Sequence, residues 1–542
     1  MKELRTDQLC KQHPVSSIQY PASIIQHPVS RIQHPVSSIN QNIMHKDTTI
    51  PEIEAAMEQA WKAFHVYRKC SLRQRADFMR AIAREIEALG DELLKVTGEE
   101  TNLPEARLRG ERGRTIFQLN QYADACEKGD WLEARIDTAI PDKTPPKPDI
   151  RKMLVPLGPV VVFGAANFPF AYSTAGGDTA TALAAGCPVI VKAHPAHAAT
   201  SELMAKAILK AALECEMPEG IFTHVHGASF EPDSYRVGKT LVEHTNTKAV
   251  GFTGSFKGGK QLFDWANQRK VPIPVFAEMS SINPVFLLPE KMKTAAADVA
   301  KMYAGSITLG VGQFCTNPGL IIGLEGQELT TFIDVLGKEI SKSVPATMLH
   351  AGIFKNYRKK KDEALKQNGV ELVSVSETKP ALNQGSPTIA TATGQTFLNN
   401  PTLHQEVFGP YSLIIRCKDM KEMLQVANKL EGQLTATLMA TENDIRIHDK
   451  IIDAITNICG RFILNNVPTG VEVCLSMQHG GPYPASTDSR FGSVGADAIK
   501  RFVRPITFQN WPDNLLPDEL KNENPLAIWR TVNNELTKEK LT

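Results

Sequence analysis

The chain has 542 residues, of which 42% are apolar and 22% charged, and its 60 basic and 59 acidic residues give a net charge of +1. This is the composition of a globular protein, and a chain longer than roughly 250–300 residues is expected to form more than one domain. The even charge balance excludes the basic footprint of a nucleic-acid-binding protein, so no nucleic-acid partner is expected.

The N-terminal sequence and the cysteines indicate the compartment. Residues 1–17 contain no apolar signal core, and the most apolar run, residues 153–166, is interrupted by Pro156 and Pro159. That run is shorter than the roughly 18 residues that a membrane-spanning helix needs. The nine cysteines are scattered and form no CxxC pair, which favours reduced thiols and no structural zinc. We therefore expect a cytoplasmic protein with no membrane partner and no metal.

Residues 12–39 are a tandem repeat of four seven-residue units, QHPVSSI, QYPASII, QHPVSRI and QHPVSSI. Proline at the third position of every unit is incompatible with a continuous helix or a coiled coil. We interpret residues 1–44 as a low-complexity, disordered leader. An extended motif that binds a partner is the alternative.

Apolar residues at helical spacing predict helices from Ile53 to about Cys126, followed by a Pro- and Lys-rich connector over residues 141–152. Beyond the connector, short apolar runs alternate with helical segments, which is typical of a parallel sheet with helices on its faces. A second unit opens at residues 305–322, glycine-rich loops fill 467–497, and a last strand near 502–508 precedes a polar tail. The strands expected in the first unit are Val160–Phe163, Val189–Val191, Phe222–Val225, Ala249–Phe252 and Ile273–Phe276.

Three loops after expected strands carry groups suited to a ligand, because parallel sheets bind ligands at the carboxyl ends of their strands. In GAANFPFA (164–171), Asn167 offers an amide donor for a developing oxyanion; a turn-capping Asn is the alternative. Lys192 ends the next strand, where it would reach a ribose hydroxyl or phosphate unless it is an ordinary solvated lysine. In TGSFKGG (253–259), the N–H groups of Gly254 and Ser255 open a helix and suit a phosphate. This loop does not match GxGxxG and is weak support by itself.

Two residues are candidates for the chemistry itself. Glu278 follows an apolar strand and precedes small residues, a setting that raises the pKa of a carboxyl and suits it to general-base catalysis; a capping Glu is the alternative. Cys315 lies in GVGQFCTNPG (310–319), where a helix N-terminus or a glycine-flanked loop can lower the pKa of a nucleophilic thiol. A buried, inert cysteine is the alternative, and it fits the other eight cysteines.

The stretch HQEVFGPYSLII (404–415) places Glu406 and Phe408 before a Gly-Pro turn and a strand. The carboxylate would hold a pair of sugar hydroxyls, and the ring would pack against a flat group. Taken alone, this stretch is a turn that enters a strand.

These motifs occur in the order NFP, VK, FTGS, a glutamate at a strand end, GQxC and EVFGP over residues 164–410. In this order the chain, from about Thr49 to the C-terminus, resembles the aldehyde dehydrogenase superfamily. The resemblance implies an α/β fold with a Rossmann-type parallel-sheet cofactor domain, an α/β catalytic domain and a β oligomerisation flap, in a homodimer or homotetramer. The implied boundaries are 45–137 and 154–280 for the cofactor domain, 281–485 for the catalytic domain, 138–153 and 498–512 for the oligomerisation strands, and 513–542 for a C-terminal tail.

The resemblance also implies NAD(P)-dependent oxidation of an aldehyde to a carboxylate through a cysteine thioester. Cys315 would attack the aldehyde carbon, Asn167 and the Cys315 N–H would hold the oxyanion, and Glu278 would activate the hydrolytic water. For the cofactor, the implied residues are Lys192 at the adenosine ribose, Gly254 and Ser255 at the pyrophosphate, and Glu406 with Phe408 at the nicotinamide ribose.

Several stretches narrow the resemblance to the α-ketoglutaric semialdehyde (2,5-dioxopentanoate) dehydrogenase branch, whose product is 2-oxoglutarate. They are FAEMSSINPVFLLP (276–289), GQFCTNPGL (312–320) and MQHGGPYPASTDSRFGSVG (477–495). A substrate with a carboxylate needs a cation in the pocket, and Arg490 is a candidate, with a surface or interface arginine as the alternative. The runner-up substrates are aliphatic aldehydes, taken with broad specificity, and succinate semialdehyde.

The sequence departs from the superfamily pattern in two places. The proline repeat stands where an N-terminal strand pair usually precedes the first helix. Three residues after Lys192, where NAD-preferring members often carry Glu, this chain has Pro195, with His194 and His197 nearby. Loss of that carboxylate removes repulsion against a 2′-phosphate, so NADP⁺ is expected in preference to NAD⁺.

Two hypotheses from other classes compete with this one. A cysteine hydrolase would pair Cys315 with a histidine, yet none of the 14 histidines sits in a recognisable motif with an Asn or Asp. A non-catalytic scaffold would tolerate loss of site residues, whereas Cys315, Glu278 and Asn167 are all present.

Overall fold

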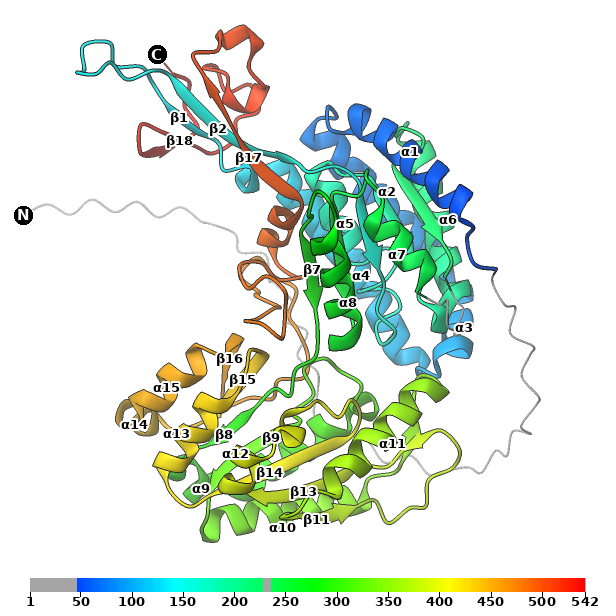
Figure 1. Ribbon diagram of the computed structural model, residues 1–542, viewed down its shortest axis with the longest axis vertical. Helices are drawn as coiled ribbons and strands as arrows, with labels where there is room; N and C mark the ends of the chain where they lie inside the picture. Colours follow the sequence, from blue (N-terminus) through cyan, green and yellow to red (C-terminus); the bar gives the residue numbers. More distant parts are fainter. Residues whose placement is uncertain (1–45, 228–234, 542) are drawn as a thin grey trace, which may run out of the picture. The chain divides into compact units, whose positions relative to one another are not determined.

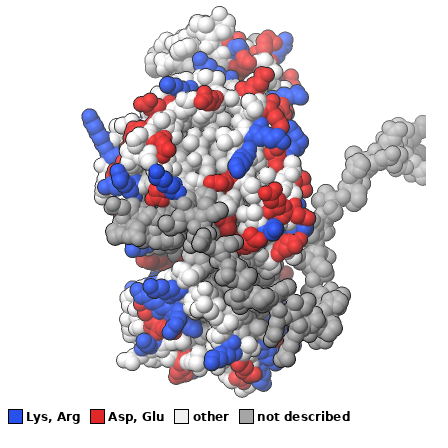
Figure 2. All heavy atoms as spheres, turned by 90° about the vertical axis from the view of Figure 1, so that its right-hand side faces the viewer, with Lys and Arg blue, Asp and Glu red and all other residues white. Residues whose placement is uncertain are grey.

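The computed structural model describes residues 46–227 and 235–541, so the leader predicted over 1–44 lies outside the described residues. The described elements form three larger sheets with helices packed on two of them (Figure 1). Within these two ranges, no helix combines the length and the apolar character that crossing a bilayer requires. The face in Figure 2 carries acidic and basic side chains interspersed over its described part.

Four helices precede the first sheet, as their apolar spacing predicts. Thr49 and Ser71 start the first two with capping boxes, in which Glu52 and Gln74 return a side-chain acceptor to the cap backbone. The second and fourth helices pack on each other and on the helices of the sheet. Their bounds are α1 Ile50–Tyr67, α2 Leu72–Ala88, α3 Gly90–Thr101 and α4 Glu105–Lys128.

The first sheet has five parallel strands in the order β5-β4-β3-β6-β7. The chain adds β4 and β5 on one side of β3 and then β6 and β7 on the other, so β3 and β6 flank the point where the direction of winding reverses, the usual place for a ligand. The strands are β3 Val160–Phe163, β4 Val189–Lys192, β5 Phe222–Val225, β6 Ala249–Thr253 and β7 Val275–Glu278. The helices are α5 Gly177–Ala185, α6 Ala198–Glu214, α7 Arg236–Glu243 and α8 Phe256–Gln268.

The second sheet has seven strands in the order β11-β13-β14-β9-β8-β15-β16, parallel except for β11. Central strands such as β9 and β15 are buried almost throughout, as expected for a sheet covered on both faces. The strands are β8 Val285–Leu287, β9 Leu320–Leu324, β11 Val370–Val375, β13 Thr388–Thr393, β14 Tyr411–Cys417, β15 Gln433–Met439 and β16 Cys459–Leu464. The helices are α9 Pro289–Thr308, α10 Gln327–Lys342, α11 Ala351–Leu365, α12 Gly394–Asn399, α13 Met420–Lys429, α14 Glu442–Ile447 and α15 Asp449–Thr456, and β10 Ala346–Thr347 pairs with β12 Gln384–Gly385.

The third sheet joins segments that are far apart in the sequence, in the order β17-β2-β1-β18-β19 (Figure 1). The strand expected from residue 138 begins only at Ile150, because the intervening segment is rich in proline, which cannot donate to a ladder. Residues 513–542 were expected to be a polar tail, yet they contribute two strands. The strands are β1 Arg135–Asp137, β2 Ile150–Pro156, β17 Val503–Gln509, β18 Arg530–Val532 and β19 Glu535–Thr537.

Buried polar groups explain why this tail is ordered. Arg530 is fully buried and donates to the carbonyls of Asn522 and Glu539 at 3.3 and 3.2 Å. Asn524 donates to the carbonyls of Ile528 and Lys538 at 2.9 and 2.8 Å. Composition marks the segment as polar, but these side chains are used to satisfy backbone groups inside the fold.

Candidate active site

The loop that carries Cys315 connects α9 to β9 through a tight turn. Gly310, Val311 and Gly312 have consecutive positive φ angles of 54°, 59° and 61°. A Cβ at Gly312 would lie 2.3 Å from the carbonyl carbon of Gly409, so this close contact requires glycine. The contact places the thiol loop against the segment that contains Glu406.

The buried side chain of Asn283 fixes the thiol loop by hydrogen bonds. Asn283 donates from Nδ2 to the carbonyls of Cys315 and Asn317, both at 2.9 Å. Its Oδ1 accepts from the hydroxyls of Ser281 and Thr435, also at 2.9 Å. Asn283 lies in the stretch FAEMSSINPVFLLP, where no local signal indicates this role.

Cys315, Glu278 and His479 meet in one cluster. The Cys315 Sγ lies 3.6 Å from His479 Nε2, which lies 3.2 Å from Glu278 Oε1. Ser493 donates to the other Glu278 oxygen at 2.8 Å. Glu278 and His479 are buried, whereas Cys315 is partly exposed. The structure therefore supplies the histidine partner for Cys315 that no sequence motif revealed.

Strand edge contacts bring the His479 loop to this position. The Met279 N–H donates to the Ala485 carbonyl at 2.7 Å, and the Ala277 N–H donates to the Thr487 hydroxyl at 2.9 Å. Residues 485–487 thus extend the first sheet beside β7, with a bridge between Glu278 and Ser486. The glycine-rich segment 467–497 is therefore part of the site.

The pKa values of Glu278 and Cys315 shift in the directions opposite to those expected. Burial alone would raise the pKa of Glu278, but the charge and hydrogen bond of His479, with hydrogen bonds from Ser493 and Cys315, outweigh it and lower that pKa. Burial raises the pKa of Cys315 well above the ordinary thiol value, and the negative charge of Glu278 adds to the rise. Both expectations, a raised carboxyl pKa and a lowered thiol pKa, are wrong: His479 lowers the pKa of Glu278, and burial, with the Glu278 charge, raises the pKa of Cys315.

A thiol, an imidazole and a carboxylate at this spacing are also a set of possible metal ligands. The three ligand atoms lie within 4.8 Å of one another. Zinc sites use these three atom types, so the arrangement permits either acid–base chemistry or capture of a metal ion.

Asn167 lies close to the thiol loop, as expected for an oxyanion donor. Its Nδ2 donates to the carbonyl of Gln313 at 3.1 Å, two residues before Cys315, and its side chain is buried. The Arg107 guanidinium donates to the Asn167 carbonyl at 2.6 Å and fixes the loop after β3.

Lys192, Gly254 and Ser255 lie along the carboxyl edge of the first sheet. Phe163 pairs with Lys192 on one side and with Phe252 on the other, which places the loops after β4 and β6 on either side of β3. Gly254 and Ser255 are exposed, and Ser255 caps α8. Burial lowers the pKa of Lys192 to about 8, which does not fit an ordinary solvated lysine.

His194 and His197 contribute no positive charge at neutral pH. Their rings stack at 5.3 Å, and burial lowers the pKa of both. His197 bonds through Nε2 to the Ala165 carbonyl at 2.9 Å, and His194 accepts from the Ala196 N–H at 3.1 Å. They order the loop after β4 by hydrogen bonding.

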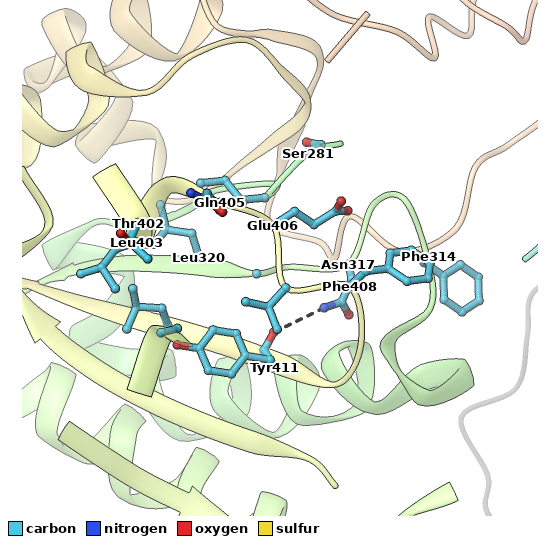
Figure 3. Close-up of a pocket in the computed structure, with 15 residues that line it drawn as sticks. Ser281, Phe314, Asn317, Leu320, Thr402, Leu403, Gln405, Glu406, Phe408 and Tyr411 are labelled. Carbon is cyan, nitrogen blue, oxygen red and sulfur yellow. Dashed lines mark hydrogen bonds between the residues drawn. The ribbon is translucent and has the colours of Figure 1, made fainter. Parts of the chain in front are cut away.

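Glu406 and Phe408 line a small pocket beside the thiol loop, together with Phe314 and Asn317 (Figure 3). Burial raises the pKa of Glu406 to about 7, with opposing hydrogen bonds from Ser280 and Ser281. Three of the expected site residues lie before strands of the second sheet: Cys315 before β9, and Glu406 and Phe408 before β14. They are therefore near the amino ends of these strands. A search of the loops that follow strands would miss them.

Arg490 is not placed as a cation of the pocket. Its side chain is 75% exposed, and its Nε donates to Asp488 at 2.9 Å. Arg490 therefore fits the interpretation as a surface arginine and not the one as a pocket cation.

Comparisons with known proteins show the family of the chain. A sequence profile of the aldehyde dehydrogenase family matches residues 34–504. An alpha-ketoglutaric semialdehyde dehydrogenase of Acinetobacter baylyi is 45% identical over 496 residues, which are 91% of this chain and 93% of the relative. Alpha-ketoglutaric semialdehyde dehydrogenase 2 of Azospirillum brasilense is 47% identical over 88% of this chain and 90% of the relative.

Solved structures share the fold. A 1-pyrroline-5-carboxylate dehydrogenase from Thermus with bound NAD is 20% identical, with a TM-score of 0.72 over 86% of each chain. Glyceraldehyde-3-phosphate dehydrogenase GapN from Methanocaldococcus jannaschii, complexed with NADP, is 20% identical, with a TM-score of 0.70 over 86% of this chain and 95% of the other. With the α/β architecture and the profile match over most of its length, this chain belongs to the aldehyde dehydrogenase family.

Proposed function

We propose that the chain oxidises 2,5-dioxopentanoate to 2-oxoglutarate with NADP⁺ or NAD⁺ through a thioester on Cys315. The observation that supports this most directly is the meeting of the Cys315 thiol with the buried Glu278 and His479. Two relatives at 45% and 47% identity, both named for this semialdehyde, support the choice of substrate.

The first step is attack by Cys315 on the aldehyde carbon. Because its raised pKa keeps the resting thiol protonated, attack requires a nearby proton acceptor. The His479 Nε2, 3.6 Å from Sγ, is placed to accept that proton, with the Glu278 carboxylate beside it. The Asn167 side chain and the Cys315 N–H would then stabilise the oxyanion.

The residues around the thiol fit a dinucleotide. The exposed Gly254–Ser255 turn heads α8, whose N-terminus favours a phosphate. Lys192 is desolvated at the neighbouring strand end, and the Glu406 carboxyl lines the pocket beside Phe408 and would hold a ribose. When bound, NAD(P)⁺ supplies the acceptor for the hydride that leaves the substrate.

Hydrolysis of the thioester needs a base, and Glu278 would serve. Its pKa is lowered, so the carboxylate is ionised at neutral pH and free to take a proton from water. Ser493 holds one carboxylate oxygen at 2.8 Å and leaves the other directed toward His479. The products are 2-oxoglutarate and the free thiol of Cys315.

NADP⁺ is the preferred cofactor in this proposal. Pro195 offers no carboxylate to repel a 2′-phosphate, and Lys192 is the cation at this strand end. Rates at subsaturating NADP⁺ and NAD⁺ test the preference, and a higher kcat/KM with NAD⁺ would reverse it.

We also propose that the cofactor domain comprises 45–137 and 154–280, that the catalytic domain comprises 281–485, and that copies of the chain associate through the third sheet into a dimer or tetramer. Large apolar side chains are exposed in and beside this sheet, namely Trp511, Leu515, Trp529 and Leu536. Light scattering of the protein and of a Trp511→Glu variant tests the association.

Initial rates with 2,5-dioxopentanoate, succinate semialdehyde and pentanal, each with both cofactors, test the function. The proposal predicts reduced cofactor with a clear preference for 2,5-dioxopentanoate, and none from Cys315→Ala. Equal turnover of all three aldehydes would favour the alternative of broad specificity. Absence of turnover would contradict the proposal.

A further inference from the structure

Two arginines on α4 contact the residues around the thiol loop without forming an ion pair, although the charge of Glu111 lies between them. Among residues 46–227 and 235–541, neither Arg107 nor Arg114 has an acidic oxygen within ion-pair distance. The Nη1 of Arg107 and the Nε of Arg114 are buried without a hydrogen-bond partner. Buried guanidinium groups normally have their donors satisfied.

We propose that Arg114, assisted by Arg107, binds the carboxylate of the substrate and makes the enzyme selective for aldehydes that carry an acid at the far end of a short chain. This inference rests on the proposed function, whose pocket cation is otherwise unassigned.

Aromatic rings connect these arginines to the reacting thiol. Arg114 donates to the Tyr172 hydroxyl at 2.9 Å, and the Tyr172 ring lies 6.0 Å from the His479 ring. Arg107 lies over Phe168 and Phe314 at 5.1 and 4.9 Å, and Phe314 immediately precedes Cys315. The two cations are therefore one aromatic layer away from the thiol and its histidine.

The position of the two arginines on α4 is set by helical spacing. Residues 107, 111 and 114 lie on one helix face, which packs on the loop after β3. Glu111 lies between the arginines, and its Oε1 accepts hydrogen bonds from the N–H groups of Phe170 and Ala171 at 2.9 and 3.1 Å. One carboxylate, with an oxygen already accepting two main-chain N–H groups, thus stands against two guanidinium groups.

Other cations near the site are already engaged. Arg461 donates to the carbonyls of Gly470 and Pro468 at 2.8 and 2.6 Å and braces that loop. Arg501 forms a buried ion pair with Asp178 at 2.7 Å. The Nε of Arg461 is also buried without a partner, but its other bonds go to main-chain carbonyls, whereas Arg114 donates to the neutral hydroxyl of Tyr172.

This geometry separates the two ends of 2,5-dioxopentanoate. The aldehyde carbon would lie at Cys315, the apolar methylene carbons would lie along the rings of Phe168 and Tyr172, and the oxo acid would lie at Arg114. Arginine suits this task because its planar fork matches a carboxylate. An uncharged aldehyde of equal length would gain nothing from the cation.

Steady-state rates of Arg114→Met and Arg107→Met with 2,5-dioxopentanoate and with pentanal test the inference. Loss of a hydrogen bond between charged groups predicts a fall of about 10- to 100-fold in kcat/KM for 2,5-dioxopentanoate, mainly through KM. Turnover of pentanal and the KM for NADP⁺ should change less than about 2-fold, since neither uses the cation. Arg114→Lys should recover part of the loss, and Arg490→Met, on an exposed arginine, is the matched control.

A second readout does not depend on turnover. 2-Oxoglutarate should protect Cys315 from iodoacetamide in the wild type and in Arg490→Met, but not in Arg114→Met. Equal losses on both aldehydes, or full protection in Arg114→Met, would overturn the inference. If the wild type itself prefers pentanal, the proposed substrate fails; if it prefers 2,5-dioxopentanoate and both α4 variants keep that preference, only the carboxylate subsite fails.

Discussion

Replacement of Glu278 by Gln should make the Cys315 thiol more reactive while it stops turnover. The structure places the carboxylate beside the thiol, where its negative charge opposes formation of the thiolate. Gln keeps the size of the side chain and removes the charge. A view of Glu278 as the base that activates Cys315 predicts the opposite, a slower thiol.

The size of the effect follows from the distance. A carboxylate oxygen of Glu278, the Cys315 Sγ and a ring nitrogen of His479 lie within 4.8 Å of one another. At that separation one unit charge contributes about 0.9 kcal/mol with the screening of water and about 3.5 kcal/mol at an effective dielectric of about 20. The pKa of Cys315 should fall by about 0.6 to about 2.5 units. Because a less basic thiolate is also a weaker nucleophile, the rate of alkylation at neutral pH should rise by about 2- to about 20-fold.

The assay is the second-order rate of iodoacetamide alkylation at Cys315, followed by mass spectrometry across a pH series. The wild-type rate should still be rising above pH 9, because the pKa is raised from 9.0. In Glu278→Gln the whole curve should shift to lower pH, and turnover of the aldehyde should be lost. Glu431→Gln, at an exposed position, is the control. Slower alkylation in Glu278→Gln at neutral pH would refute this electrostatic account.

Three further changes test other parts of the site. Burial raises the pKa of Glu406 to about 7, so the KM for NADP⁺ should increase as the pH falls below about 7. In Glu406→Gln this KM should be high and independent of pH. The same pH dependence in both proteins would contradict a role of Glu406 in cofactor binding. Zinc chloride should inhibit by binding Cys315, Glu278 and His479, EDTA should restore activity, and EDTA alone should have no effect; loss of activity with EDTA alone would indicate a required metal. Asn283→Ala removes the donor that the Cys315 and Asn317 carbonyls share. Urea titration should show a free energy of unfolding lower by about 1–3 kcal/mol, and kcat should fall. Unchanged stability would show that another group replaces the hydrogen bonds of Asn283.

The fold was accessible from sequence because its helices and strands depend on local signals. Strands such as Val160–Phe163 are short β-branched runs, and the α/β alternation of the first sheet is confirmed. The glycines before Cys315 are visible in the sequence, and the structure uses Gly312 for a close backbone contact with Gly409. Family membership followed from motif order, and the profile match confirms it.

The features that sequence did not predict depend on contacts between distant segments. His479 is 164 residues from Cys315, and its role depends on a strand edge that residues 485–487 extend. The pKa directions of Glu278 and Cys315 were wrong because the sequence did not show His479 beside Glu278 or the burial of the thiol beside a carboxylate. Arg107 and Arg114 lie in a helix whose spacing shows only that they share a face, and nothing local indicates which loop that face contacts.

Intact-mass measurement of Glu278→Gln after mixing with 2,5-dioxopentanoate and NADP⁺ tests the central claim most directly. With the hydrolytic base removed, the protein should gain the mass of one 2-oxoglutaryl group, located at Cys315 by peptide mapping and released by hydroxylamine. Cys315→Ala in the same background should gain nothing. A protein that reduces NADP⁺ without acylation of Cys315, or an acyl group on another cysteine, would contradict the thioester mechanism.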